Sequence, residues 1–241
     1  MRVRKLATVC AILASLAAGS AWASEAAIRK AVQARFPDIP VDSVSKTPFG
    51  GMYEVVVGGG RRILYTDEKV SYIFIGNLLD TRGMGERDLT AERSAQLAAQ
   101  ALRKSTDQAI KRVRGNGKRV IYTFEDPNCG FCRQLQRELQ KISDITIYTF
   151  LFPILSQDSV DKSRAIWCAK DRAKAWDDVM LRGAAAQSDG QCETPIDRNK
   201  ELAQRFRINS TPAIFFADGS MNGGYMPAEQ LEQALNSVAA K

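Results

Sequence analysis

The 241-residue sequence contains no histidine. This absence excludes a cysteine–histidine nucleophile pair and any zinc site that combines cysteine with histidine. A zinc site made of cysteines alone usually needs two close pairs, and Cys168 and Cys192 are far apart in the sequence. We therefore expect no metal site.

The sequence also has only a small net charge and few long apolar runs. The formal net charge is +7, and Arg2, Arg4 and Lys5 supply three of the positive charges. A net positive charge this small does not predict nucleic-acid binding. We interpret the basic cluster at 111–119 as a solvated face beside a linker. After the N-terminal segment no run is long and apolar enough to span a bilayer, so we expect no stable membrane insertion.

The N-terminal segment has the pattern of a secretory signal peptide. Its three basic residues precede the uncharged, mostly apolar run 6–18. Ala21-Trp22-Ala23 then provides a small-x-small cleavage site, which predicts a signal peptide over residues 1–23 and an exported protein.

The pattern that carries the most chemistry is Cys129-Gly130-Phe131-Cys132. The apolar, strand-like run 120–124 precedes it, and the helix-like run 133–139 follows it. This spacing places one thiol at a helix N-terminus, where unsatisfied N–H groups and the helix dipole favour a thiolate. The pair therefore predicts a thiol–disulfide exchange site that uses no cofactor besides its own redox-active disulfide.

Four cysteines remain after the signal peptide, and they allow three disulfide connectivities. The spacing favours Cys129 with Cys132 and Cys168 with Cys192. The second pair would close a loop of about two dozen residues, which could stabilise the fold by roughly 3 kcal/mol.

The chain between the signal peptide and residue 117 predicts a small α+β unit and a linker. Helical spacing at 25–36 ends at Pro37, and strand-like runs follow at 52–57, 61–65 and 70–75. The segment 91–113 is rich in good helix formers, with Thr90 as its N-cap and Gly115-Asn116-Gly117 as its end. We interpret it as a spacer helix, with a helix packed on one domain as the alternative.

An α/β pattern follows from residue 118. Strands are expected at 120–125, 145–151 and 213–217, and helices at 163–180, 200–206 and 227–238.

Thr211-Pro212, before the last strand, together with the cysteine motif, resembles the thioredoxin fold. The Thr-Pro pair is similar to that family's cis-proline loop, which faces the reactive disulfide.

The match is closer still to the DsbC-type thiol:disulfide interchange proteins of the bacterial periplasm. The segments 124–132, 165–171 and 176–180 are similar to their active-site and helical-insertion segments, and 64–67 and 75–78 to strands of their N-terminal domain. The resemblance implies an α+β and α/β chain with a cystatin-like dimerisation domain (24–88), a helical linker (89–117) and a thioredoxin-like catalytic domain with a helical insertion (118–241).

The resemblance also implies roles for individual residues. Cys129 and Cys132 would be catalytic, and Cys168 and Cys192 would form the structural disulfide. The loop that binds substrate would comprise Thr211, Pro212, Gly130 and Phe131. We leave open whether Phe131 is an exposed contact or a packing residue, and Tyr225 is equally ambiguous.

The implied protein is a periplasmic homodimer that isomerises non-native disulfides in misoxidised exported proteins. A membrane reductase of the DsbD type would keep it reduced. The alternatives are a DsbG-type reductase of oxidised cysteines, a DsbA-type dithiol oxidase and a chaperone.

One departure from thioredoxin concerns the acid that thioredoxin buries six residues before its first cysteine. Thr123 occupies that position here. Glu125 and Asp126 lie nearby, but the sequence does not orient them, so proton handling is expected to differ.

Overall fold

The computed structural model describes residues 24–239, and the expected signal peptide lies outside them. The chain divides into two compact units, Met1–Ala91 and Glu92–Lys241. Within the described residues, no helix combines the length and apolar character needed to cross a membrane.

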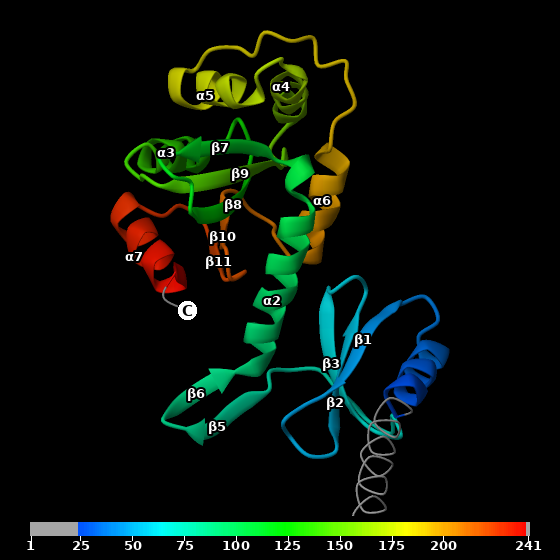
Figure 1. Cartoon of the computed structure of the whole chain (residues 1–241). Coiled ribbons are helices and arrows are strands. Elements are labelled where there is room, and N and C mark those ends of the chain that lie inside the picture. The colour runs from blue at the N-terminus through cyan, green and yellow to red at the C-terminus, as the bar shows by residue number, and fades with distance from the viewer. Residues whose placement is uncertain (1–23, 240–241) are drawn as a thin grey trace, which may run out of the picture. The chain divides into compact units, whose positions relative to one another are not determined.

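The first unit is a helix packed on an antiparallel sheet (Figure 1). The sheet has the order β1 (Val41–Lys46), β2 (Met52–Val57), β3 (Arg62–Asp67) and β4 (Ile73–Phe74). The helix spans 24–35 in the described chain, and its Ile28 and Val32 pack against the buried face of the sheet.

Three parts of this unit differ from the sequence-based prediction. The strand expected at 70–75 is limited to β4, Ile73–Phe74, because Val70 has a positive φ and does not continue a strand. β1 was not expected, because a register shift between Val41 and Ser43 interrupts the alternation of buried and exposed positions. The hairpin of β5 (Leu79–Gly83) and β6 (Gly85–Asp88) was also not expected, because its side chains are mostly exposed and show no apolar face.

The predicted helix 91–113 is wrong in its extent and in its role as a spacer. The helix, α2, covers Leu89–Lys104, and Ala98, Ala101 and Leu102 belong to the core of the second unit. The alternative, a helix packed on one domain, therefore describes the structure. Asp88 accepts the hydrogen bond from the N–H of Ala91, so the first turn is capped by Asp88 and not by Thr90.

The segment after α2 forms a strand. A short 3₁₀ turn (Thr106–Gln108) leads into β7 (Ile110–Arg114), which pairs with the central sheet. Gly115 and Gly117, expected to end a helix, lie instead in the tight connection from β7 to β8, where both have positive φ.

The second unit is built on a five-stranded sheet with the order β11-β10-β8-β9-β7. The remaining strands are β8 (Arg119–Glu125), β9 (Ile145–Leu151), β10 (Ala213–Phe216) and β11 (Met221–Gly223). β8 and β9 are parallel, and the other neighbours are antiparallel. As predicted, the cysteine motif follows the central strand β8 directly.

Helices cover both faces of this sheet (Figure 1). α2 and α6 (Ile196–Arg205) pack on the face that carries Tyr122 and Phe124. α3 (Gly130–Leu139) and α7 (Ala228–Ala239) pack on the opposite face, against Ile121. Alternation along β8 therefore sends Thr123 and Glu125 toward the α3 side.

The predicted helix 163–180 is in fact two helices. α4 (Gln157–Cys168) ends at Cys168, and α5 (Arg172–Arg182) begins after its N-cap, Asp171, which accepts a hydrogen bond from the N–H of Lys174. Asp171 favours a new N-terminus because its carboxylate satisfies a free N–H of the first turn.

Candidate active site

Cys129 is the N-cap of α3, as the sequence predicts. Its backbone is extended, and its sulfur accepts a hydrogen bond from the N–H of Cys132 at 3.3 Å. The strand β8 and the helix α3 position the two thiols together, because only three residues separate the end of β8 from the cap. Both cysteines are free thiols, and both are buried.

The pKa values of the two thiols are shifted in opposite directions. Hydrogen bonding from Cys132 lowers the pKa of Cys129 to about 6, and bonds from Thr211 and from the backbone N–H groups of the first turn act in the same direction. Burial raises the pKa of Cys132, and the hydrogen bond to Cys129 and the charge of Glu125 raise it further. Cys129 is therefore the nucleophile near neutral pH, and Cys132 stays protonated until its proton finds an acceptor.

The Thr211-Pro212 loop lies beside the nucleophile. The peptide bond between them is cis, and the sulfur of Cys129 lies 3.4 Å from the carbonyl oxygen of Thr211. Pro212 is buried, and its own carbonyl accepts a hydrogen bond from the N–H of Gly224. The structure thus brings together the cysteine motif and the Thr-Pro pair, which are far apart in the sequence.

Asp126 fixes a loop next to the thiols, a role that the sequence did not reveal. Its side chain is fully buried, and one carboxylate oxygen accepts hydrogen bonds from the N–H groups of Ile154 and Leu155 at 2.9 and 3.0 Å. The other oxygen accepts from the N–H of Asn128 at 2.8 Å. Asp126 therefore ties two exposed apolar side chains to the segment that leads into Cys129.

Asn128 connects the same segment to the helical insertion. Its amide donates to Asp158 and Ser159, and its carbonyl accepts from Lys162 at 2.7 Å. These partners all lie on α4, so the backbone before Cys129 is held from two sides.

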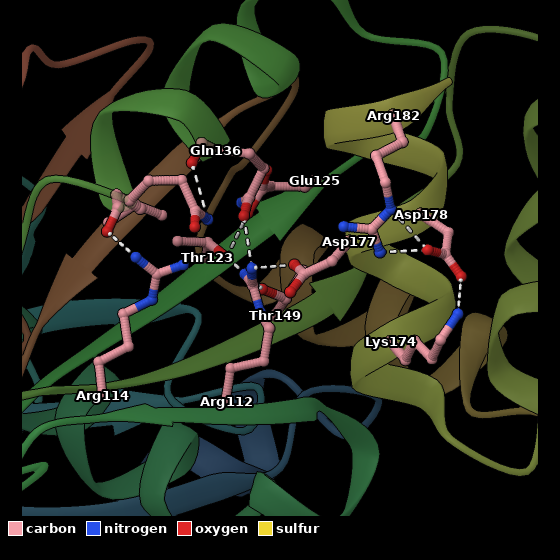
Figure 2. Close-up of polar contacts among 12 residues, drawn as sticks. Arg112, Arg114, Thr123, Glu125, Gln136, Thr149, Lys174, Asp177, Asp178 and Arg182 are labelled. Atoms are coloured by element: carbon pink, nitrogen blue, oxygen red, sulfur yellow. Dashed lines mark hydrogen bonds and ion pairs between the residues drawn. The ribbon is translucent and has the colours of Figure 1, made fainter. Parts of the chain in front are cut away.

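A buried polar network lies on the α3 side of the sheet (Figure 2). Glu125 has no exposure, and both of its carboxylate oxygens accept from the amide of Gln136, at 2.7 and 2.9 Å. Thr123 Oγ1 lies 2.6 Å from the same carboxylate. Burial raises the pKa of Glu125 to about 7, against the opposing effects of Thr123 and Arg112.

Arg112 completes this network and corrects the interpretation of the basic cluster as a solvated face. Its guanidinium is buried and donates to Gln136, to Thr149 and, at 3.0 Å, to Asp177 of α5. The neighbouring Lys111 and Val113 are exposed, because alternation along β7 directs them to the other side. A strand assignment for 110–114 would have been needed to predict this burial.

Phe131, left open by the sequence, is exposed over 60% of its surface and is therefore not a core packing residue. Gly130 is also exposed, and a Cβ built there would meet no atom within 4 Å. Tyr225 is about one-third exposed, at 37%. The open side of the site is therefore formed by Gly130, Phe131 and the loop carrying Ile154 and Leu155.

Cys168 and Cys192 form a disulfide with a Cα–Cα distance of 5.6 Å. It joins the end of α4 to the segment before α6. Within residues 24–239 no three cysteine, aspartate or glutamate side chains are grouped so as to hold a metal ion.

Comparison with known proteins covers both units. Residues 106–239 match the family model described as a thioredoxin-like domain, and residues 19–91 match the disulfide bond isomerase protein N-terminal domain. The chain is 42% identical over 210 residues to the probable thiol:disulfide interchange protein DsbC of Bordetella pertussis, covering 87% of this chain and 73% of that protein.

Two further matches are more distant or cover less of the chain. The thiol:disulfide interchange protein DsbC of Escherichia coli is 28% identical over 222 residues, which is 90% of each chain. The crystal structure of a disulfide interchange protein from Neisseria gonorrhoeae is 41% identical with a TM-score of 0.53, and the match covers 55% of this chain and 96% of that one. The chain therefore belongs to the DsbC family of thiol:disulfide interchange proteins.

Proposed function

We propose that this protein isomerises non-native disulfides in exported proteins through Cys129, with Cys132 as the resolving thiol. The observation that carries the proposal is the split in acidity within one dithiol. Cys129 has a pKa of about 6, and the pKa of its fully buried neighbour Cys132 is raised. A thiolate at Cys129 with a protonated partner favours attack on a substrate over immediate closure of the enzyme's own disulfide.

The exchange proceeds through a mixed disulfide. The Cys129 thiolate attacks one sulfur of a substrate disulfide, and the other substrate sulfur leaves as a thiolate. That thiolate then attacks a different disulfide in the substrate, and Cys129 is released when a substrate thiolate displaces it. No net oxidation results. If the substrate stalls, Cys132 attacks Cys129, and the substrate leaves reduced by two electrons.

The exposed apolar side chains around Cys129 suit a misfolded substrate. Phe131, Ile154 and Leu155 are exposed over 60%, 41% and 56% of their surfaces. A non-native protein presents apolar side chains that a native one buries, so such a surface provides contact without requiring a particular sequence.

The first unit supports a homodimer. The β5–β6 hairpin is an isolated two-stranded sheet with a fully exposed Met84 at its turn, and hairpins of this kind are marginal without a partner. Leu79, Phe74 and Ile75 are also exposed in this unit. Pairing of two copies through the hairpin would cover these side chains. Sedimentation of wild type and of the double variant Leu79→Asp/Met84→Asp tests this: a dimer and a monomer are expected, and two dimers would contradict it.

We further propose that the protein works in the periplasm and is kept reduced by a DsbD-type membrane reductase. The signal-peptide pattern and the family membership support this location. A site that closes its disulfide during stalled cycles needs an external electron donor to reopen it.

The test measures whether the protein restores native disulfide pairing in a scrambled multi-disulfide substrate, which we call isomerase activity. The reduced protein should restore native pairing, Cys129→Ser should abolish the activity, and Cys132→Ser should retain part of it. Net oxidation of a reduced substrate without reshuffling would instead indicate an oxidase. Reduction of a sulfenic-acid substrate alone would indicate a reductase, and recovery by Cys129→Ala/Cys132→Ala would indicate chaperone action.

A further inference from the structure

The resolving cysteine poses a problem of proton transfer. Cys132 has no exposed surface, so solvent does not reach its thiol. Cys132 must lose its proton before it can attack Cys129, because the thiolate is the nucleophile in exchange. The proton acceptor therefore has to be a buried group on the protein side of the site.

Glu125 occupies the right position for this acceptor. Cys132 and Gln136 are four residues apart on α3 and share its buried face. Gln136 donates to both oxygens of the Glu125 carboxylate, so that carboxylate lies against the buried face of α3 that also carries Cys132. The electrostatic effect of Glu125 on the pKa of Cys132 is consistent with this proximity.

Asp126 is the other fully buried carboxylate near the dithiol, but its role is to bind backbone N–H groups. Its two oxygens accept three backbone N–H groups, those of Asn128, Ile154 and Leu155. Protonation of Asp126 would weaken these bonds and release the loop. The Glu125 carboxylate, in contrast, is bound by the side chains of Gln136 and Thr123, so its protonation does not release a backbone loop.

The negative charge of the Glu125 carboxylate is offset by a nearby buried cation. The cation is Arg112 of β7, which is linked to Gln136 of α3, to Thr149 of β9 and to the Asp177 carboxylate of α5 (Figure 2). The charged and titratable groups that face the pair from the surrounding elements are Arg114 (β7), Asp177 (α5), Cys129 and Cys132 (α3 and its cap). Thr123 of its own strand binds the carboxylate directly.

We propose that Glu125 takes the proton of Cys132 in the resolving step, and that Arg112, held by Asp177 of the helical insertion, is a positioning residue that sets how readily it does so. This inference deepens the proposed function and rests on the dithiol chemistry described there. It makes the helical insertion an electrostatic part of the redox site.

The step conserves charge and electrons. The Cys132 thiol transfers its proton to the Glu125 carboxylate, so the negative charge of Glu125 moves from its oxygen to the sulfur of Cys132. The Cys132 thiolate attacks Cys129, forming their disulfide and breaking the bond between Cys129 and the substrate sulfur. The substrate sulfur leaves as a thiolate, the dithiol is oxidised, and the substrate disulfide is reduced. On re-reduction the proton returns from Glu125 to Cys132.

The experiment uses stopped-flow reaction of the reduced full chain with substoichiometric 5,5′-dithiobis(2-nitrobenzoate). The first release of thionitrobenzoate reports attack by Cys129, and the second reports resolution by Cys132. For wild type we expect an inflection of the second phase near pH 7, the pKa of Glu125. For Glu125→Gln we expect a second phase at least about ten-fold slower at pH 7.5, without that inflection, and a first phase changed by less than about three-fold.

The positioning residues give shifts of opposite sign, which a purely structural role would not produce. Arg112→Met removes the cation beside the carboxylate, so the inflection of the second phase should move to higher pH, and Arg112→Lys should bring it back toward wild type. Asp177→Asn removes the anion that shares Arg112, so the inflection should move to lower pH.

Asp178 provides a matched control. It is next to Asp177 on α5, but its ion pairs are with Lys174 and Arg182, on the surface (Figure 2). Asp178→Asn should leave both phases and the inflection unchanged. If Arg112→Met fails to fold, the half-buried Asp177 still provides the test.

A second phase in Glu125→Gln with the wild-type rate and pH profile would overturn the proposal. So would shifts of the same sign in Arg112→Met and Asp177→Asn. Because this reagent needs no protein substrate, the result is independent of isomerase activity. Loss of refolding activity with both phases intact would count against the proposed function alone.

Discussion

The two faces of the central sheet are built from alternate residues of the same strands, yet they have opposite characters. On the α2 side, Phe124 stacks on Phe150 with ring centroids 4.8 Å apart, and Tyr122 stacks on Tyr148. On the α3 side, the corresponding positions at the end of β8 hold Thr123 and Glu125. The first face stabilises the fold through apolar burial, and the second holds a charge in the interior where the dithiol needs it.

This contrast shows how one strand separates stability from chemistry. Burying a carboxylate is unfavourable unless its charge is offset, and the buried charge of Arg112 favours the ionised Glu125 at this end of the sheet. Farther along the same face, Ile121 and Ile147 restore an apolar core. The polar part is therefore confined to the end of the sheet that meets Cys129.

The largest test of the apolar face is removal of α2. A chain that begins at Glu92 keeps Ala98, Ala101 and Leu102 in the core and should unfold cooperatively. A chain that begins at Lys118 lacks both α2 and β7, and we expect no cooperative transition in thermal denaturation monitored by circular dichroism. Cooperative unfolding of the shorter chain at a similar temperature would show that α2 is a spacer after all.

Phe124→Ala should break the apolar face at its centre. Phe124 is fully buried and contacts Phe150, Phe152 and Phe215, so we expect a loss of about 4 kcal/mol in the free energy of unfolding by urea.

Phe49→Ala is the matched control, because Phe49 is 62% exposed and should change stability by less than about 0.5 kcal/mol. The Cys129 pKa, read from thiolate absorbance, should stay near 6 in any folded Phe124→Ala protein. A large shift would mean that the two faces are not separable.

The polar face should make the free energy of unfolding depend on pH. The pKa of Glu125 rises from 4.5 to about 7 on folding, so the folded state binds this proton more tightly than the unfolded state. Stability from this group is then lost as the pH rises from 4.5 to 7, by roughly 3 kcal/mol at 1.36 kcal/mol per pKa unit.

Urea unfolding of the reduced protein between pH 4.5 and 8 measures this loss. Glu125→Gln should show a flatter profile than wild type over that window, and the difference between the two profiles isolates the carboxylate. Parallel profiles would place the ionisation of Glu125 elsewhere.

The smallest expected effect is that of Thr123→Val. The change removes the hydroxyl 2.6 Å from Glu125 with little change in shape, at a cost of about 1 kcal/mol. It should also move the inflection of the resolving phase to higher pH, because this hydrogen bond favours the charged carboxylate.

Thr146→Val makes the same change on the opposite side of β9, where Thr146 bonds the carbonyl of Gly117. It should alter stability by a similar amount and leave the inflection in place. An equal shift in both variants would remove the link between Thr123 and the acid.

The sequence could predict the apolar strands and the local features of the site, but not its polar part. The apolar strand β9 was predicted with its bounds, 145–151, because its residues are β-branched and aromatic throughout. The position of Cys129 at the start of a helix followed from local spacing. These features depend on neighbours in the chain, which a sequence displays.

The polar part of the site depends on partners far apart in the sequence. β7 was not predicted because its inward residue, Arg112, is charged, and a pattern of apolar alternation does not mark such a strand. The environment of the buried Glu125 depends on Gln136 of α3 and on Arg112 of the edge strand β7. No local pattern orients it toward the thiols.

The connection from α2 into β7 has a consequence for the length of the chain between them. Side chains alternate along β7, so one residue inserted between Lys104 and Ile110, with the pairing of β7 unchanged, would move Lys111 into the position of Arg112 and turn Arg112 to the opposite face. Two inserted residues would place Ile110 there instead, without a positive charge. The number of residues in this connection therefore determines which side chain lies beside Gln136 and Thr149, and with it the charge next to the buried carboxylate.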